Sequence, residues 1–235
     1  MDVKKLLLAT VAAGGIALAS QPASALYVGT TPGGGANPNN VIGAVEGWFG
    51  ATWYLIAGAD TLIDVYYVGF EAGATNSFAL NGTTYQTVGG GNTGLSSLFG
   101  GTVVPVLVGA SLTSPGLIDF SFTTSFNGPA TVTNANNQEP PAIPNFFSTV
   151  TTCGADITTC VFDTTINGAT ASGGNTLLIA LDDGGAGIDD NHDDLVMIIK
   201  ISNGSVSVPE PATLGLLGAG LLGLGFAARR RRKTA

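Results

Sequence analysis

Short apolar segments dominate the chain between residues 26 and 208, and each ends at Gly, Asn or Pro after about ten residues or fewer. Segments of that length that are rich in Val, Ile, Thr and aromatic residues are typical of β-strands. No amphipathic pattern of helical length occurs in the same region. The sequence therefore predicts an all-β domain, with strands expected at residues 41–45, 51–57, 61–70, 77–80, 83–88, 102–108, 117–126, 160–166, 176–181 and 195–202.

Three local patterns refine this prediction. Residues 117–126 alternate between apolar and polar side chains, as in a half-buried strand. Asn81-Gly82 predicts a two-residue hairpin, because both residues tolerate a positive φ. Pro105 lacks a backbone N–H and so favours an edge or a bulge for the strand around it. The face of the alternating strand that is expected to be buried carries Ile118, Phe120, Phe122 and Phe126.

The remaining segments complete a single domain over residues 26–207. Residues 176–181 and 195–202 are apolar enough to form central strands. Many short strands without helices indicate a two-sheet sandwich of the jelly-roll kind. Loops are expected at residues 26–40 and 129–144, and a flexible link at residues 89–91.

The first 25 residues have the form of a secretory signal peptide. Lys4 and Lys5 open it, an apolar stretch follows at residues 6–19, and Ala23 and Ala25 frame an A-x-A cleavage site. Cleavage after Ala25 would start the mature chain. The alternative is a retained N-terminal anchor.

Residues 208–233 combine a Pro-Glu-Pro motif, an uncharged apolar run and a basic cluster, in that order. The apolar run, residues 214–228, would reach roughly 22 Å as a helix, which spans a bilayer only with local thinning or with help from flanking residues. The basic cluster, residues 229–233, would hold that end in the cytoplasm. The motif comprises Val208, Pro209, Glu210, Pro211, Ala212 and Thr213.

This three-part order resembles the PEP-CTERM sorting signal, which exosortase-type enzymes recognise in Gram-negative bacteria that make exopolysaccharide. The resemblance implies an inner-membrane precursor held by a transmembrane sorting helix and cut by an exosortase-type protease at residues 208–213. It further implies that the product is periplasmic, at the cell surface or extracellular, with exopolysaccharide as a partner. The alternative is a plain tail anchor in which Pro-Glu-Pro occurs by chance.

The domain between these two segments is strongly acidic. Lys200 is its single basic residue against fourteen Asp and Glu, which gives a net charge of −13. A surface so poor in cations cannot release counterions from phosphate backbones, so nucleic acid is excluded as a partner. An acidic surface instead suits an exported protein kept soluble by self-repulsion or by divalent cations.

Cys153 and Cys160 are the only cysteines. In an oxidising compartment, a closely spaced pair predicts a disulfide that closes a small loop. A redox or metal-binding pair is the alternative, but the spacing is not C-x-x-C and no other thiol supports it.

Six acidic residues crowd into residues 182–194, between the two expected central strands. Carboxylates at this density repel one another unless a cation neutralises them or water screens them. The Asp189-x-Asn191-x-Asp193 spacing resembles the opening of a calcium loop, although the EF-hand pattern fails at its sixth and twelfth positions, Asp194 and Lys200. The alternative is a solvated acidic loop.

This stretch also resembles a motif of many PEP-CTERM and related secreted proteins, in which an acidic pair, a Gly-rich loop and Asp-x-Asp-Tyr-Asn-Asp-Leu-Val connect two strands. Here Asp182 and Asp183 stand at the acidic pair, and His192 stands where that motif has Tyr. Calcium is therefore the expected cofactor. Its expected ligands are Asp183, Asp189, Asn191, Asp193 and Asp194, with Asp182 and Asp190 outside the ligand set.

Two functions from different classes are open. The first is a non-enzymatic surface or matrix protein with a structural or binding role. The second is a secreted polysaccharide-active enzyme, a glycoside hydrolase or lyase on a jelly-roll scaffold, which would need two carboxyl groups about 5–9 Å apart in an aromatic-lined groove. The only histidine, His192, is expected to be a solvated loop residue, because no Ser or Cys is singled out as its nucleophile partner. We therefore expect no enzymatic activity and assign no catalytic residue.

Overall fold

The computed structural model describes residues 27–31, 39–138, 144–162, 173–184 and 191–208. The chain divides into two compact units, and every described residue belongs to the unit formed by residues 25–209. Three antiparallel sheets make up this unit, and its described residues contain no α-helix. The prediction of an all-β domain is confirmed in this form.

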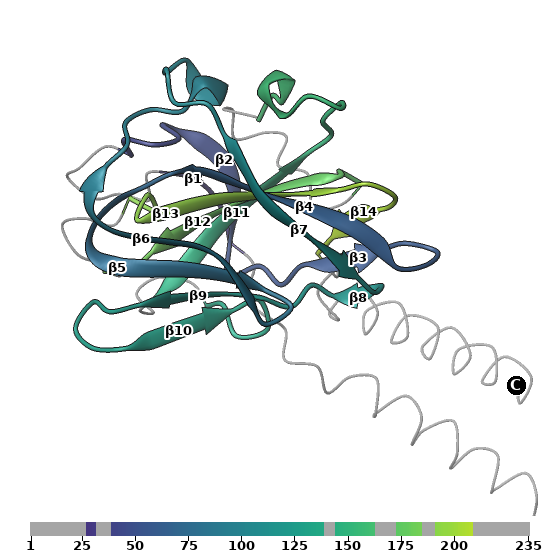
Figure 1. Cartoon of the computed structure of the whole chain (residues 1–235), viewed down its shortest axis with the longest axis horizontal. Helices are drawn as coiled ribbons and strands as arrows, with labels where there is room; N and C mark the ends of the chain where they lie inside the picture. The colour runs from purple at the N-terminus through teal and green to yellow at the C-terminus, as the bar shows by residue number, and fades with distance from the viewer. Residues whose placement is uncertain (1–26, 32–38, 139–143, 163–172, 185–190, 209–235) are drawn as a thin grey trace, which may run out of the picture. The chain divides into compact units, whose positions relative to one another are not determined.

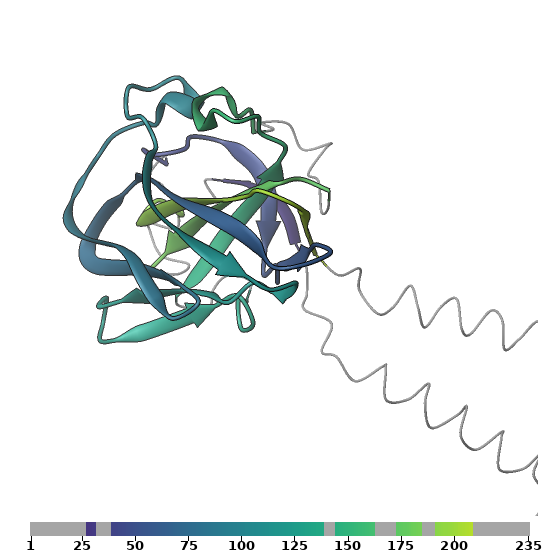
Figure 2. The same ribbon diagram turned by 45° about the vertical axis from the view of Figure 1, so that its right-hand side comes forward.

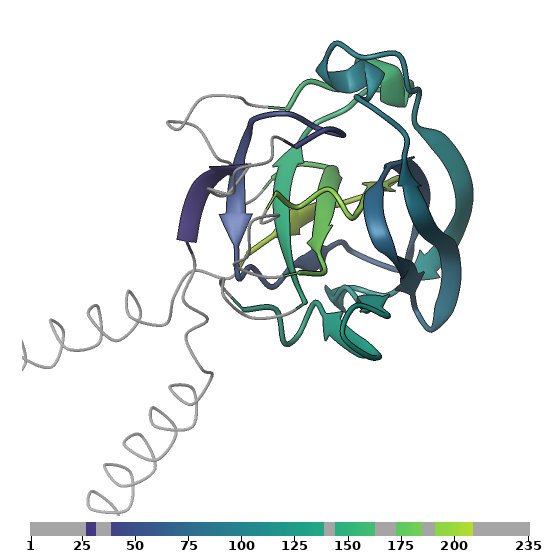
Figure 3. The same cartoon turned by 90° about the vertical axis from the view of Figure 1, so that its left-hand side faces the viewer.

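The largest sheet has seven strands in the order β1-β2-β11-β12-β13-β4-β7. In Figure 1, β12 and β13 run through the middle of the domain. Figure 3 shows β1 beside β2 at one border of the sheet. The seven strands are β1 (Tyr27–Thr31), β2 (Val45–Phe49), β4 (Thr61–Gly69), β7 (Val106–Thr113), β11 (Asn145–Thr151), β12 (Thr176–Asp182) and β13 (Leu195–Ile201).

Two smaller sheets pack on the same side of the large one. Their orders are β10-β9-β5-β6 and β14-β3-β8. The four-stranded sheet contains β5 (Glu71–Leu80), β6 (Thr83–Asn92), β9 (Phe120–Thr124) and β10 (Ala130–Thr133). The three-stranded sheet contains β3 (Tyr54–Ile56), β8 (Gly116–Leu117) and β14 (Ser205–Ser207).

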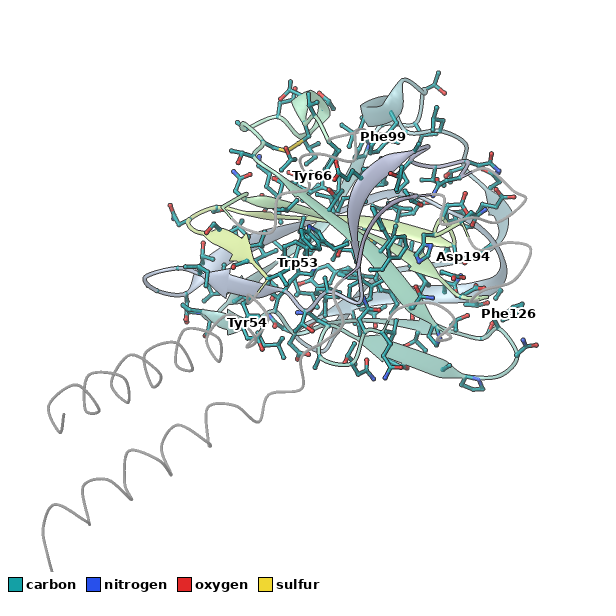
Figure 4. The ribbon with its side chains drawn as sticks, turned by 180° about the vertical axis from the view of Figure 1, so that it is seen from behind. Trp53, Tyr54, Tyr66, Phe99, Phe126 and Asp194 are labelled. Carbon is teal, nitrogen blue, oxygen red and sulfur yellow. A yellow bond between two sulfur atoms is a disulfide. The ribbon has the colours of Figure 1, made fainter. Side chains whose placement is uncertain are left out.

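The main core lies between the large sheet and the two smaller ones. Phe120 of β9 packs on Phe146 of β11 with ring centroids 5.2 Å apart, which joins two of the sheets. Trp53 is fully buried in this core, at the centre of the domain in Figure 4. Its indole Nε1 donates to Ser148 Oγ at 2.8 Å, so the one polar atom of the ring is satisfied.

A second core covers the opposite face of the large sheet. Leu178 and Ala180 of β12 pack there with Ile42 and with Ile157. Two 3₁₀ turns, η1 (Ser97–Phe99) and η2 (Ile157–Thr159), lie side by side over this face (Figure 2). Because β12 and β13 are buried on both faces, their residues read as continuous apolar runs and not as an alternation.

Several strand predictions are confirmed. β12 and β13 are central, and β4 spans Thr61–Gly69 as expected. Asn81 and Gly82 form the predicted turn between β5 and β6, with φ of 50° and 74°. The strand expected at residues 102–108 instead begins at Val106 and runs to Thr113, so Pro105 lies just outside it; this strand, β7, is the last in the order of the large sheet.

Side chains from the hairpin β5–β6 cover the border of β7. Tyr85 Oη donates to the Ala110 carbonyl oxygen at 2.9 Å, and Asn81 Nδ2 donates to Thr113 Oγ1 at 2.9 Å. The bond from Tyr85 occupies a backbone carbonyl group of β7, and the bond from Asn81 holds the hairpin against the end of this strand.

Other local predictions are wrong, each for a physical reason. Phe126 is 39% exposed, because β9 ends at Thr124 and the chain turns before the alternation reaches Phe126. It lies at the periphery of the domain in Figure 4. The segment 89–91 is part of β6, and a bulge in the pairing with β5 falls among its glycines, between the pairs Ala72–Gly91 and Thr75–Gly89. Strands β1 and β10 occupy stretches expected to be loops.

Candidate functional site

The hairpin β12–β13 brings the two ends of the acidic stretch together. Asp183 follows β12 directly, and Asp194 directly precedes β13 (labelled in Figure 4). The Asp183 N–H donates to Asp194 Oδ2 at 2.8 Å, and the Asp194 N–H donates to the Leu181 carbonyl oxygen at 3.2 Å. The Asp194 carboxyl group is therefore fixed to the backbone of Asp183, at the same end of the hairpin.

Neighbouring strands supply amide side chains to these acids. Asn76 of β5 donates from Nδ2 to Asp183 Oδ2 at 2.7 Å. Asn145 of β11 donates from Nδ2 to Asp182 Oδ2 at 3.1 Å. Asn76, Asn145 and Asp182 are completely buried, and Asp183 is 5% exposed. The described part of the acidic stretch is thus built into the protein interior.

The segment before β2 holds the other end of the stretch. Asn39 accepts from the Ile42 N–H through Oδ1 at 2.7 Å and donates from Nδ2 to the Asn191 carbonyl oxygen at 2.6 Å. The Asn40 N–H donates to Asp193 Oδ2 at 2.6 Å. Asn39 and Asn40 therefore fix the positions of Asn191 and Asp193 relative to the large sheet.

His192 is completely buried, which overturns the expectation of a solvated loop histidine. Its ring contacts Phe49 edge-on, with centroids 5.2 Å apart, and its Nε2 lies 2.8 Å from Asn145 Oδ1. Because Asn145 uses its Nδ2 to donate to Asp182, its Oδ1 is the acceptor, so Nε2 carries the proton. Burial lowers the pKa of His192 to about 3, so the ring is neutral at physiological pH.

The pKa of Asp194 is raised to about 9. Burial is the main cause, followed by the nearby negative charge of Asp183; the bond from the Asp183 N–H opposes the rise. Two carboxyl groups this close and this poorly hydrated cannot both ionise cheaply. A proton on Asp194 lowers this cost.

Asn76 also has a buried polar atom that lacks a hydrogen-bond partner within the described part of the chain. Its Oδ1 atom is buried and has no hydrogen-bond partner among the described residues, although its Nδ2 is bonded to Asp183. A buried carbonyl oxygen without a donor costs free energy. An oxygen ligand beside carboxylates is a group that a hard cation would use.

Four of the five expected calcium ligands lie in this buried cluster: Asp183, Asn191, Asp193 and Asp194. The fifth, Asp189, lies outside the described residues. Within the described residues alone, no group of three or more His, Cys, Asp or Glu side chains could hold a metal ion. Sequence reasoning missed Asn39, Asn40, Asn76 and Asn145, which lie far away in the chain and follow no motif.

The predicted disulfide is present. Cys153 and Cys160 are joined, and their Cα atoms lie 5.0 Å apart. Both cysteines are buried in the second core, next to Ile157. Asn175 holds the start of this loop, because it accepts from the Cys153 N–H and donates to the Cys153 carbonyl oxygen.

Of the expected sorting motif, only Val208 is described, and it is buried in the main core. Pro209, Glu210, Pro211, Ala212 and Thr213 lie outside the described residues, as do the apolar run 214–228, the basic cluster 229–233 and the signal cleavage residues Ala23 and Ala25. Among the residues that the structure describes, no helix has the length and apolar character needed to cross a membrane.

Comparison with known proteins identifies one family model. Residues 207–232 match the PEP-CTERM protein-sorting motif. No curated protein and no solved structure matches the chain. The motif indicates an exported protein that an exosortase sorts. The chain therefore carries a PEP-CTERM protein-sorting motif at residues 207–232.

Proposed function

We propose that this protein is a non-enzymatic, exported β-domain with a structural or binding role at the cell surface or in an exopolysaccharide matrix. An exosortase would cut a membrane-anchored precursor at residues 208–213 to deliver it there. The observation that carries this proposal is the match of residues 207–232 to the PEP-CTERM protein-sorting motif. The net charge of −13 over residues 26–207 also suits a soluble, exported product.

Calcium is the cofactor that we propose for the domain. Asp183, Asp189, Asn191, Asp193 and Asp194 would hold it, since all five are hard oxygen donors. The buried carboxyl groups and the raised pKa of Asp194 support a cation at this place, because a bound cation would remove the cost of keeping the carboxylates together. The unpartnered Oδ1 of Asn76 supports it independently.

The described acids do not form a metal site by themselves, so the proposal depends on Asp189. Bound calcium would tie the end of β12 to the start of β13 and neutralise their charges. In the metal-free protein the same role falls to the proton on Asp194, which the raised pKa keeps in place at neutral pH.

The test is thermal unfolding of the released protein in chelator and in 5–10 mM calcium. Extracellular sites commonly bind calcium at ~0.1–1 mM, and a hundredfold excess over Kd adds about 2.7 kcal/mol, or roughly 5–10 °C in Tm. The parent should show this rise, and Asp189→Asn should abolish it.

Asp190→Asn is the matched control, because it removes the same charge from the neighbouring position and should keep the rise. No rise in the parent, or an equal rise in Asp189→Asn, would contradict calcium binding and leave only an acidic loop.

A further inference from the structure

The last strand of the domain, β14, runs directly into the sorting motif. Its backbone is bonded on both sides. It pairs with β3 in the register Ser205–Ile56, Val206–Leu55 and Ser207–Tyr54. On its other side, the Val206 N–H donates to the Gly174 carbonyl oxygen at 2.8 Å, and the Gly173 N–H donates to the Val206 carbonyl oxygen at 3.1 Å.

The side chains of this segment are anchored as firmly as its backbone. Val206 is completely buried and Val208 is 8% exposed, and both belong to the main core with Leu55. Ser205 and Ser207 point the other way and are partly exposed. The alternation of a core strand therefore continues to Val208.

The sorting motif and the folded domain overlap. The family match begins at Ser207, and Ser207 and Val208 are also the last two described residues of the domain. No linker separates the core from Pro209. Proteolysis of a folded segment requires that it first open locally, because a peptide must be extended and free of other bonds to be gripped.

We propose that β14 sets the position of the cut. The docked strand blocks the peptide bonds before Val208, and the sorting protease cuts only on the C-terminal side of Val208. Val206 and Val208 are then specificity-determining residues for the processing reaction, although they act through the fold and not through contact with the reacting atoms. This inference rests on the processing that we proposed above.

The first measurement is the intact mass of the released protein, expressed as the full chain in cells that carry the sorting protease. The C-terminal residue should be Val208 or a later residue. A released, folded product that ends before Val208 would overturn the inference and the cut position proposed above, but it would leave sorting through the motif intact. If no cut occurs at all, both are wrong.

The second measurement is the half-time of processing by pulse-chase. Six Gly and Ser residues inserted between Val208 and Pro209 should shorten it by roughly threefold to tenfold, because they move the docked strand away from the residues that the protease must grip. The same six residues inserted in the exposed turn between Asn127 and Gly128 should change nothing. An unchanged or longer half-time with the first insertion would contradict the role of β14.

Discussion

Asp194 has the properties of a carboxyl group that the fold keeps protonated. Its side chain is buried at the end of a hairpin, Asp183 lies beside it, and its pKa is raised to about 9. His192 is a neutral ring for the opposite reason, since burial lowers its pKa to about 3. The two residues therefore change the free energy of unfolding in opposite directions as the pH rises.

The sign for each residue follows from which state binds the extra proton. Between pH 3.8 and about 9 the folded protein holds a proton on Asp194 that the unfolded chain has lost, so the free energy of unfolding falls as pH rises. Between about 3 and 6.5 the unfolded chain protonates His192 and the folded protein does not, so the free energy of unfolding rises with pH. Of these two residues, only Asp194 still changes the free energy of unfolding above pH 6.5.

We predict that in chelator the free energy of unfolding falls from pH 6.5 to about 9, by at most about 1.4 kcal/mol per pH unit. Asp194→Asn should remove this dependence, because the amide cannot ionise yet still accepts from the Asp183 N–H. Urea unfolding at a series of pH values measures it. A flat profile in the parent would show that Asp194 is ionised in the folded protein.

For single residues, the sequence predicted which acidic residues lie together but not which side chains surround them. The density of Asp in residues 182–194 pointed to the cluster directly. The burial of this cluster was not predictable, because it depends on Asn39, Asn76 and Asn145, which lie in three other parts of the chain. The position of His192 between Phe49 and Phe147 is likewise a product of tertiary packing.

Among the elements, the most apolar strands were the easiest to predict. β12 and β13 have apolar residues on both faces because both faces are covered. β10 was missed because its short run, Ala130–Thr133, lies among Pro and Asn residues that indicate a loop, although Val132 faces the core. β1 pairs with β2 through the backbone, which leaves little pattern in its sequence. The jelly-roll arrangement stays a prediction.

The disulfide that closes the loop from Cys153 to Cys160 should stabilise the folded domain. This loop covers one face of the large sheet, and Ile157 packs from it into the second core. Loop-closure entropy predicts that reduction lowers the free energy of unfolding by about 2–3 kcal/mol. Denaturant unfolding of the oxidised and reduced protein measures the difference.

The double variant Cys153→Ala with Cys160→Ala separates the cross-link from packing. It should be at most as stable as the reduced parent, because it loses the buried sulfur atoms as well. A reduced parent as stable as the oxidised one would show that the fold, not the disulfide, holds this loop.

The whole molecule combines a folded β-domain with a sorting motif at residues 207–232. Export and sorting could be predicted from a few residues of the sequence, because a sorting enzyme recognises a local motif. The activity of the domain could not be predicted in this way, because a binding surface is assembled from strands that lie far apart in the sequence. The sorting motif is therefore the part of the function that can be tested most directly.

The decisive measurement replaces Pro209-Glu210-Pro211 by Ala-Ala-Ala in the full chain and follows the protein in membrane and released fractions, with intact mass as the readout. We predict that the parent is cut and released, whereas the variant accumulates uncut in the membrane. A variant that is cut and released like the parent would contradict sorting through this motif.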